Sequence, residues 1–539
     1  MNFPKGRLIL VFVCAGSAVL PGMAAGPASR QTLATTPAPA LAVATGARID
    51  PDDPPKGVFL DDWYVVTLAG KRCGHMHSTA RRFRDRTLGR DVVESVTKLE
   101  ITVGRDDQTV RIGTTEQSVE TLDGRPVSFL SRTDMSLMSM EVTGRVVGED
   151  EVAVTTRQLG QTRTQRYRLP KGAVMTWGSY REQVRRGLAV GTRYTIPCYA
   201  PAMAADRTIP TTFEVLAEED IDLYGRVVRT RKTRQTMQAD TMLGPMKVET
   251  IAWVDEAHKP LKLEMEVARQ RVSVIHCDKA IALQEIDPPE LMAETLIPAQ
   301  LPAGAARAES VTYRITRREP GDVPLVLPET PMQKVERNRN ELIVTVTRGG
   351  IKAGPAPSTS RPGPEDLKEL RAATPWVNTD DPAIRRLAEE AAGGETDPVR
   401  LVPRLRAFVT DYVKSKDMSV GFGSASEVAR SRQGDCSEHA VLLAALARAC
   451  GLPSRGVSGV VHSAEFAGRR NVFVWHMWTQ VYVAGRWVDT DPALGQDDVD
   501  PTHIAMGIVN FGDAGLAEMT LPIWHLIGQI RIEVVRVGS

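Results

Sequence analysis

The sequence predicts a multidomain fold, in which a mostly antiparallel β region precedes an α+β domain. From Gly57 to about Ala280 the chain has short alternating runs such as 63-WYVVTLAG-70 and 261-LKLEMEVAR-269. Such alternation between turn residues is typical of strands with one buried face. From residue 365 the apolar spacing becomes helical, and strands return only after Gly451. Helices followed by strands indicate an α+β domain.

Length and charge limit the kind of protein this is. The chain has 539 residues, too many for one ordinary hydrophobic core. Its 67 basic and 66 acidic residues give a net charge of +1, and no block of like charge stands out. We therefore expect no nucleic-acid partner.

Changes in composition divide the chain into segments. We predict a signal peptide (1–25), an Ala/Pro/Thr-rich linker (26–57), a β-rich domain (58–284), a Pro/Ala linker (285–306), a small β segment (307–350), a second linker (351–364) and the α+β domain (365–539).

The N-terminus has the pattern of an export signal. Lys5 and Arg7 precede the apolar run 8–20, and small residues follow at Ala24 and Ala25. The run is shorter than the roughly 20 apolar residues of a membrane span. We expect a periplasmic or secreted mature chain without a membrane span, with cell-envelope components among its partners. A retained anchor is the alternative.

Five cysteines follow the predicted signal, and an odd number leaves at least one thiol unpaired. Cys436 and Cys450 lie about 21 Å apart on one predicted helix, too far for a disulfide. The pairing of Cys73, Cys198 and Cys277 stays open. No spacing suits a zinc site, and His75 with His77 lacks a third ligand. We expect no metal and no cofactor.

The stretch 431-SRQGDCSEHAVLLAALARACG-451 predicts a helix that begins with a cysteine. Asp435 suits the N-cap and Glu438 completes a capping box. A thiol at the first helical residue, Cys436, lies at the positive end of the helix dipole, which favours thiolate. Neighbouring amides can also stabilise an oxyanion. Alternatively, Cys436 is a small buried residue, as we expect for Cys450.

A base for this thiol is found in the strand 472-VFVWHMWTQVYV-483. With Ala484-Gly485 as a tight turn, Gln480 faces Asp489 and Trp478 faces Asp491. His476 and Asp491 are then diagonal neighbours on one face. A cysteine, a histidine and an orienting aspartate are the components of covalent acyl transfer. The other histidines, His503 among them, show no supporting pattern.

Three stretches resemble the bacterial transglutaminase-like superfamily, whose core is similar to papain. They are "GDCSEHAVLLAALARACGLPSRGVSG", "WHMWTQVYVAGRWVDTDPALGQ" and "DPTHI". The resemblance implies Cys436 as nucleophile, His476 as base and Asp491 as third member. The sequence differs from animal transglutaminases in having Asp435 before the cysteine, and it shows no calcium loop.

Residues around this triad have further expected roles. Gln433 is a candidate second oxyanion donor beside the backbone N–H of Cys436. Trp478 matches a motif position of the family, and His439 is expected to support the site or the helix rather than to act as base.

We therefore expect an exported thiol enzyme that acts on peptide or glutamine carboxamide bonds through a thioester. A protein or peptide is the expected substrate, and a protease or amidase is favoured over a crosslinking transglutaminase. The alternative is a non-catalytic cell-envelope binding or scaffold protein that retains the fold.

Overall fold

The computed structural model describes residues 48–538, apart from 106–107, 136–137, 159–160, 242–243, 268–269, 291–294, 320–324, 339–340, 352–361, 415–422 and 513–525. The predicted signal peptide (1–25), most of the linker 26–57 and most of the linker 351–364 lie outside the described residues.

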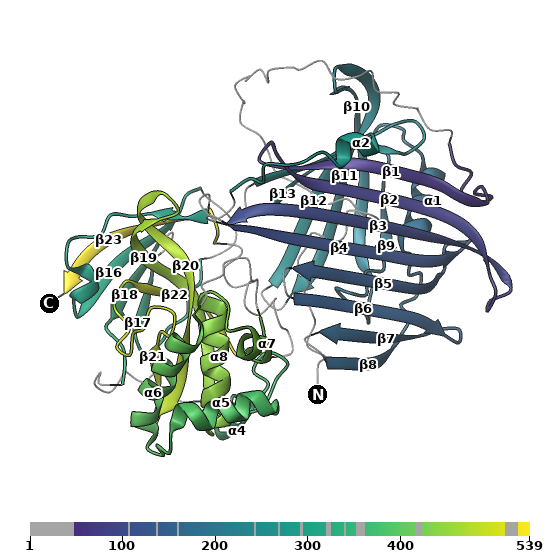
Figure 1. Cartoon of the computed structure of the whole chain (residues 1–539). Coiled ribbons are helices and arrows are strands. Elements are labelled where there is room, and N and C mark those ends of the chain that lie inside the picture. Colours follow the sequence, from purple (N-terminus) through teal and green to yellow (C-terminus); the bar gives the residue numbers. More distant parts are fainter. Residues whose placement is uncertain are drawn as a thin grey trace.

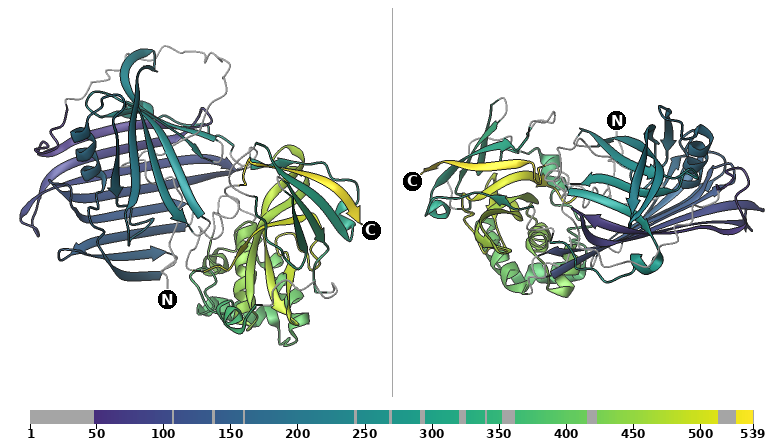
Figure 2. Two further views of the ribbon diagram at one scale, coloured as in Figure 1. Left: turned by 180° about the vertical axis from the view of Figure 1, so that it is seen from behind. Right: turned by 90° about the horizontal axis from the view of Figure 1, so that it is seen from above.

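The N-terminal region is one antiparallel sheet of fourteen strands in the order β8-β7-β6-β5-β4-β3-β2-β1-β14-β13-β12-β11-β10-β9. The sheet bends so that β9–β13 lie behind β1–β6 (Figures 1 and 2). The first eight strands are β1 (Gly57–Leu68), β2 (Lys71–Asp85), β3 (Arg90–Arg105), β4 (Gln108–Thr121), β5 (Pro126–Met135), β6 (Met138–Val147), β7 (Glu151–Gln158) and β8 (Gln161–Arg168). The other six are β9 (Arg193–Cys198), β10 (Ile209–Leu223), β11 (Arg226–Thr241), β12 (Gly244–Val254), β13 (Pro260–Val267) and β14 (Gln270–Cys277).

Helix α1 (Thr176–Arg186) connects β8 and β9, the two edge strands of this sheet. Its start is fixed by the buried carboxylate of Glu120 on β4, which accepts hydrogen bonds from the backbone N–H groups of Trp177 (2.6 Å) and Gly178 (2.9 Å). A short helix, α2 (Lys279–Ala282), follows the sheet.

The C-terminal region contains two smaller sheets (Figure 1). In the five-stranded sheet the order is β15-β20-β19-β22, with β21 also paired to β20; in the four-stranded sheet it is β17-β18-β16-β23. The strands are β15 (Ile297–Pro298), β16 (Ser310–Arg317), β17 (Gln333–Asn338), β18 (Glu341–Thr347), β19 (Ser454–Phe466), β20 (Arg469–Val483), β21 (Arg486–Thr490), β22 (His503–Val509) and β23 (Ile530–Gly538).

These pairings join segments that are far apart in the chain. Part of the predicted linker 285–306 is a strand, because β15 pairs with β20. The predicted small β segment 307–350 shares a sheet with the last strand of the chain, since β16 pairs with β23. A 3-10 turn, η2 (Ala305–Arg307), precedes β16.

The helices precede the strands of the five-stranded sheet, apart from β15, which confirms the predicted α+β class. They are α4 (Pro364–Glu369), α5 (Pro382–Ala392), α6 (Pro398–Tyr412), α7 (Ala425–Ser431) and α8 (Cys436–Ala449). Asp381 and Asp397 cap α5 and α6, and Ser424 with Glu427 forms a capping box at the start of α7. All residues of α8 from Ser437 to Arg448 are buried, since it packs between α5–α7 and strands β19 and β20.

The two C-terminal sheets pack face to face and thereby hold β22 in place. Tyr313 and Phe473 meet edge to face in their shared core. The side chain of Gln333 donates to the backbone oxygen of Ala505 on β22 (2.9 Å) and accepts from its N–H (2.8 Å). The Tyr313 hydroxyl donates to the oxygen of Pro501, just before β22 (2.8 Å).

None of the five cysteines in the described residues takes part in a disulfide. Within the same residues, no helix is both long enough and apolar enough to cross a membrane.

Because α8 is buried, we expect that shortening one of its apolar side chains strongly destabilises the fold. We expect Leu443→Ala to lower the free energy of unfolding by about 2–5 kcal/mol, because Leu443 is fully buried and its loss leaves a cavity. Leu494→Ala, at a position 48% exposed, is the matched control and should cost well under 1 kcal/mol. Urea unfolding followed by tryptophan fluorescence measures both; equal costs would contradict this packing.

Candidate functional site

Cys436 is held at the start of α8 by the capping box that the sequence predicted. The Asp435 carboxylate accepts from the N–H of Ser437 (2.9 Å). The Glu438 carboxyl accepts from the N–H groups of Asp435 (2.9 Å) and Gly423 (2.7 Å). The first turn of the helix is therefore fixed on both sides of the half-buried thiol.

Gly434, two residues before the cysteine, must be glycine. Its φ of +149° is unfavourable for other residues, and an added Cβ would lie 2.2 Å from Cβ of Glu438. The tight approach brings the chain onto the buried Glu438 side chain and so sets the direction in which α8 begins.

Burial raises the pKa of Glu438 well above its usual range, and the adjacent Asp435 carboxyl raises it further. Both effects favour the protonated, uncharged form of the Glu438 carboxyl. Cys436 is the first residue of α8 and lies at the positive end of the helix dipole, which favours a thiolate there.

Strands β20 and β21 form the predicted hairpin. Ala484 and Gly485 have φ of 50° and 77°, as both central residues of a type I′ turn require. The turn places Gln480 opposite Asp489, in the predicted register.

The ladder ends one pair before the predicted contact of Trp478 with Asp491. Its last pair is Thr479 with Thr490. Asp491 instead forms a backbone bridge with Gln496, with both N···O distances 2.8 Å. The bridge between Asp491 and Gln496 could not be predicted from the strand register, because it depends on the conformation of the loop after β21.

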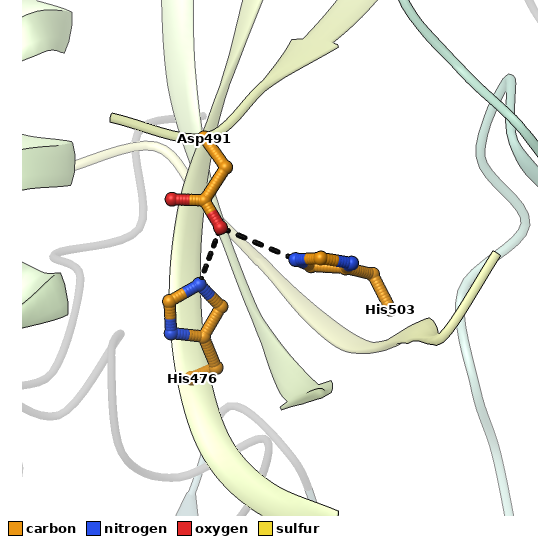
Figure 3. A group of neighbouring side chains, drawn as sticks. All are labelled: His476, Asp491 and His503. Atoms are coloured by element: carbon orange, nitrogen blue, oxygen red, sulfur yellow. Dashed lines mark hydrogen bonds and ion pairs between the residues drawn. The ribbon is translucent and has the colours of Figure 1, made fainter. Parts of the chain in front are cut away.

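The Asp491 carboxylate is the most constrained group of the site. Its Oδ1 accepts from the backbone N–H groups of Ala493 (2.8 Å) and Leu494 (3.0 Å). Its Oδ2 accepts from Nε2 of His476 (2.7 Å) and Nε2 of His503 (3.2 Å) (Figure 3). The two histidines outweigh the effect of burial and hold the pKa of Asp491 well below its usual range.

His476 thus presents one ring nitrogen to Asp491 and directs the other, Nδ1, away from it (Figure 3). Its side chain is almost completely buried. A histidine fixed through one nitrogen by a carboxylate has a defined tautomer and ring orientation, which is what a general base needs.

His503 is a member of the site that sequence reasoning missed. It begins β22, and its ring lies between two carboxylates: Nε2 faces Asp491, and Nδ1 lies 3.2 Å from the backbone oxygen and 3.4 Å from Oδ1 of Asp500. Although burial alone would lower it, these two partners raise the pKa of His503 to about 9. The stretch "DPTHI", in which Asp500 and His503 are three residues apart, was the signal available in the sequence.

The loop between β21 and β22 closes into a ring of hydrogen bonds. The Gln496 side chain donates to Oδ2 of Asp500 (2.8 Å) and accepts from its N–H (3.0 Å). Oδ1 of Asp500 accepts from the N–H of Thr502 (2.8 Å). Gln496 also forms a backbone bridge with Asp491, and His503 bonds to the Asp491 carboxylate, so the loop holds Asp491 and His503 together.

Trp478 packs within the site and is not available as an oxyanion donor. Its indole N–H donates to Oδ1 of Asp489 (2.8 Å). Its ring lies 6.2 Å from that of His476 and 5.3 Å from that of His503, centre to centre. Gly459 makes room for it, because a Cβ there would lie 2.9 Å from the indole.

The remaining predicted residues lie near the start of α8. Nδ1 of His439 is 2.6 Å from the backbone oxygen of Asp435, and the side chain is buried. Gln433 lies just before the helix, where its N–H donates to Oγ of Ser431 (3.3 Å). The first bond ties His439 to the start of the helix, and the oxyanion role of Gln433 stays a prediction.

Helix α8 packs on the strand that carries His476. The Thr479 hydroxyl of β20 donates to the backbone oxygen of Ala440, one turn beyond Cys436 (3.1 Å). The site therefore combines a helix that begins with a thiol and a strand with a carboxylate-bound histidine.

Possible metal-ligand atoms of His476, Asp491 and His503 lie within 4.8 Å of one another. The separations of 2.7 and 3.2 Å between Nε2 and Oδ2 suit N–H···O hydrogen bonds. Both Nε2 atoms then carry a proton, which a metal ion would have to displace. We therefore interpret the group as a hydrogen-bond network.

The raised pKa of His503 predicts that stability falls at alkaline pH. An unfolded histidine titrates near 6.5, so the folded chain holds an extra proton between about 6.5 and 9. This contribution, on the order of 3 kcal/mol, is complete below about pH 6.5 and disappears as pH rises through 9. Urea unfolding should therefore show a steeper loss from about pH 6 to 10 in wild type than in His503→Gln. Parallel curves would contradict the assignment.

A comparison with known protein families matches the part of the chain that contains Cys436, His476 and Asp491. Residues 385–492 match the sequence model described as "Transglutaminase-like superfamily". No curated protein matched the chain.

Three solved structures show distant similarity. A candidate cysteine protease from Cytophaga hutchinsonii is 15% identical (43% of this chain and 84% of that one, TM-score 0.26). A β-barrel-like protein from Brucella abortus, of a domain of unknown function, is 12% identical (40% and 95%, TM-score 0.31). A candidate protease from Parabacteroides distasonis is 12% identical (66% and 64%, TM-score 0.18). On the sequence match, residues 385–492 are a domain of the transglutaminase-like superfamily.

Proposed function

We propose that this chain is a thiol enzyme that cleaves peptide or glutamine carboxamide bonds. Cys436 is the nucleophile, His476 the base and Asp491 the residue that orients His476. The observation that carries the proposal is the 2.7 Å hydrogen bond between Nε2 of His476 and the buried Asp491 carboxylate, on a strand against which the cysteine-first helix packs. Membership of residues 385–492 in the superfamily supports the same assignment.

The reaction begins with transfer of the thiol proton from Cys436 to Nδ1 of His476. The thiolate attacks the carbonyl carbon, and its π electrons move to oxygen to give a tetrahedral oxyanion. The backbone N–H of Cys436 stabilises this oxyanion at the start of α8. The neighbouring Ser437 N–H is already used by Asp435.

Collapse of the oxyanion breaks the carbon–nitrogen bond. The leaving nitrogen takes the proton from His476 and departs as an amine, or as ammonia when the substrate is a glutamine side chain. The product on the enzyme is a thioester of Cys436. Throughout, Asp491 stabilises the imidazolium and does not itself take the proton.

Water as acceptor completes a hydrolysis: His476 removes a proton from water, the hydroxide adds to the thioester, and the thiol and a carboxylate are released. An amine acceptor would complete a transamidation instead. We favour hydrolysis, because this chain has the motif "GDC" at residues 434–436. Bacterial members of the superfamily with that motif resemble proteases and amidases. We further propose that the enzyme acts outside the cytoplasm, on the basis of residues 1–25.

Intact-mass spectrometry of a glutamine-containing peptide library tests this proposal, with and without a primary amine. We expect cleaved or deamidated peptides with wild type and a loss of at least 1,000-fold in rate with Cys436→Ala, because the nucleophile is removed. Amine adducts would assign a transferase.

Cys450→Ala is the matched control, since Cys450 lies at the other end of α8 and should leave the rate unchanged. Products that persist in Cys436→Ala would refute the nucleophile. No product from any peptide would favour a non-catalytic cell-envelope binding protein.

A further inference from the structure

His503 and His476 reach the same oxygen atom from different strands. Strand β22 pairs with β19, and β19 pairs with β20, so the two histidines lie two strands apart in the sheet. Their rings meet at Oδ2 of Asp491 from different sides (Figure 3). The side chain of His503 is fully buried, so water does not compete for its partners.

The surroundings of His503 define its protonation state. Nε2 faces the Asp491 carboxylate, and Nδ1 faces the backbone oxygen and the carboxylate of Asp500. All of these atoms accept hydrogen bonds, so both ring nitrogens must donate. Only the doubly protonated imidazolium has two donors.

The charges balance only when this cation is counted. Asp491 and Asp500 supply two negative charges, and the His503 imidazolium supplies one positive charge. Transfer of the thiol proton to His476 adds the second positive charge and makes the four groups neutral in sum. Asp489 also lies nearby, and burial raises its pKa. Arg406 also acts on Asp491, but its guanidinium is paired with Asp497. Without the His503 cation, Asp491 would therefore lie buried without an ionic partner of its own whenever His476 is neutral.

We propose that His503 is a positioning residue of the active site, whose buried imidazolium holds Asp491 in place and sets the proton affinity of the Cys436–His476 pair. This inference rests on the function proposed above. His503 does not touch the reacting atoms and acts only through Asp491.

Removal of the His503 cation should shift the pH at which the Cys436 thiolate forms in one predictable direction. A positive charge near the pair lowers the proton affinity of both the thiol and the imidazole. Its loss raises both, and a less firmly held Asp491 stabilises the His476 imidazolium less. Both effects move formation of the Cys436 thiolate to higher pH.

The rate of iodoacetamide alkylation of Cys436 in the full chain, followed by peptide mass spectrometry from about pH 4 to 9, measures this directly. We expect a low midpoint in wild type and a midpoint about one unit higher in His503→Gln. That shift corresponds to about tenfold slower labelling below the wild-type midpoint. His503→Lys, which retains a cation, should lie closer to wild type than His503→Gln.

His462→Gln is the matched control. His462 lies on β19, with Nε2 3.1 Å from the backbone oxygen of Ala299, a bond that glutamine can keep. It should leave the midpoint unchanged. Cys450 is the internal reference, because unfolding would expose it and speed its labelling, whereas an electrostatic effect on Cys436 would not.

Each other outcome overturns the inference. An unchanged Cys436 midpoint in His503→Gln, or the same shift in the lysine and glutamine variants, removes the role of the cation while the proposed function stands. Slow labelling of wild-type Cys436 at mildly acidic pH, equal to that of Cys450, refutes both. Loss of the low midpoint after EDTA treatment would assign the cluster to a metal ion instead.

Discussion

The site depends on one constraint, the complete burial of the Asp491 carboxylate. A charge removed from water is stable only when paired and hydrogen-bonded, and Asp491 has four donors, two from backbone and two from histidine rings. Because each donor has a fixed direction, together they fix the carboxylate. Three features of the fold place or hold a donor at the Asp491 carboxylate. They are the hairpin turn, the loop from β21 to β22 and the packing of the four-stranded sheet. The geometry of His476 follows from this arrangement.

Local parts of the site could be predicted from the sequence, because they depend on neighbours in the chain. The capping residue Asp435 and the turn at Ala484 and Gly485 use short-range rules, and both were predicted correctly. The strand register predicted from this turn also placed His476 near Asp491, and the two side chains are hydrogen-bonded in the structure. Whether the two residues act in catalysis with Cys436 remains a proposal.

The parts that could not be predicted are long-range. The contact of His503 with Asp491 requires β22 to pair with β19, and no periodicity within either strand specifies that neighbour. The pairing of β15 with β20 and of β23 with β16 joins segments that the composition had separated. The predicted β-rich character of the N-terminal region follows from alternation, but its order of fourteen strands does not. The hairpin places His476 near Asp491, and the pairing of β22 with β19 places His503 there.

The proposed mechanism requires that the Cys436 thiol give its proton to His476 before the substrate is attacked. The ultraviolet absorbance of a thiolate, taken as the difference between wild type and Cys436→Ala while pH is lowered, tests it most directly. We expect a Cys436 thiolate that persists well below the pKa of about 8.5 of an ordinary cysteine and that is lost at low pH in His476→Ala. A Cys436 thiol that titrates near 8.5 in wild type, and equally in His476→Ala, would contradict it.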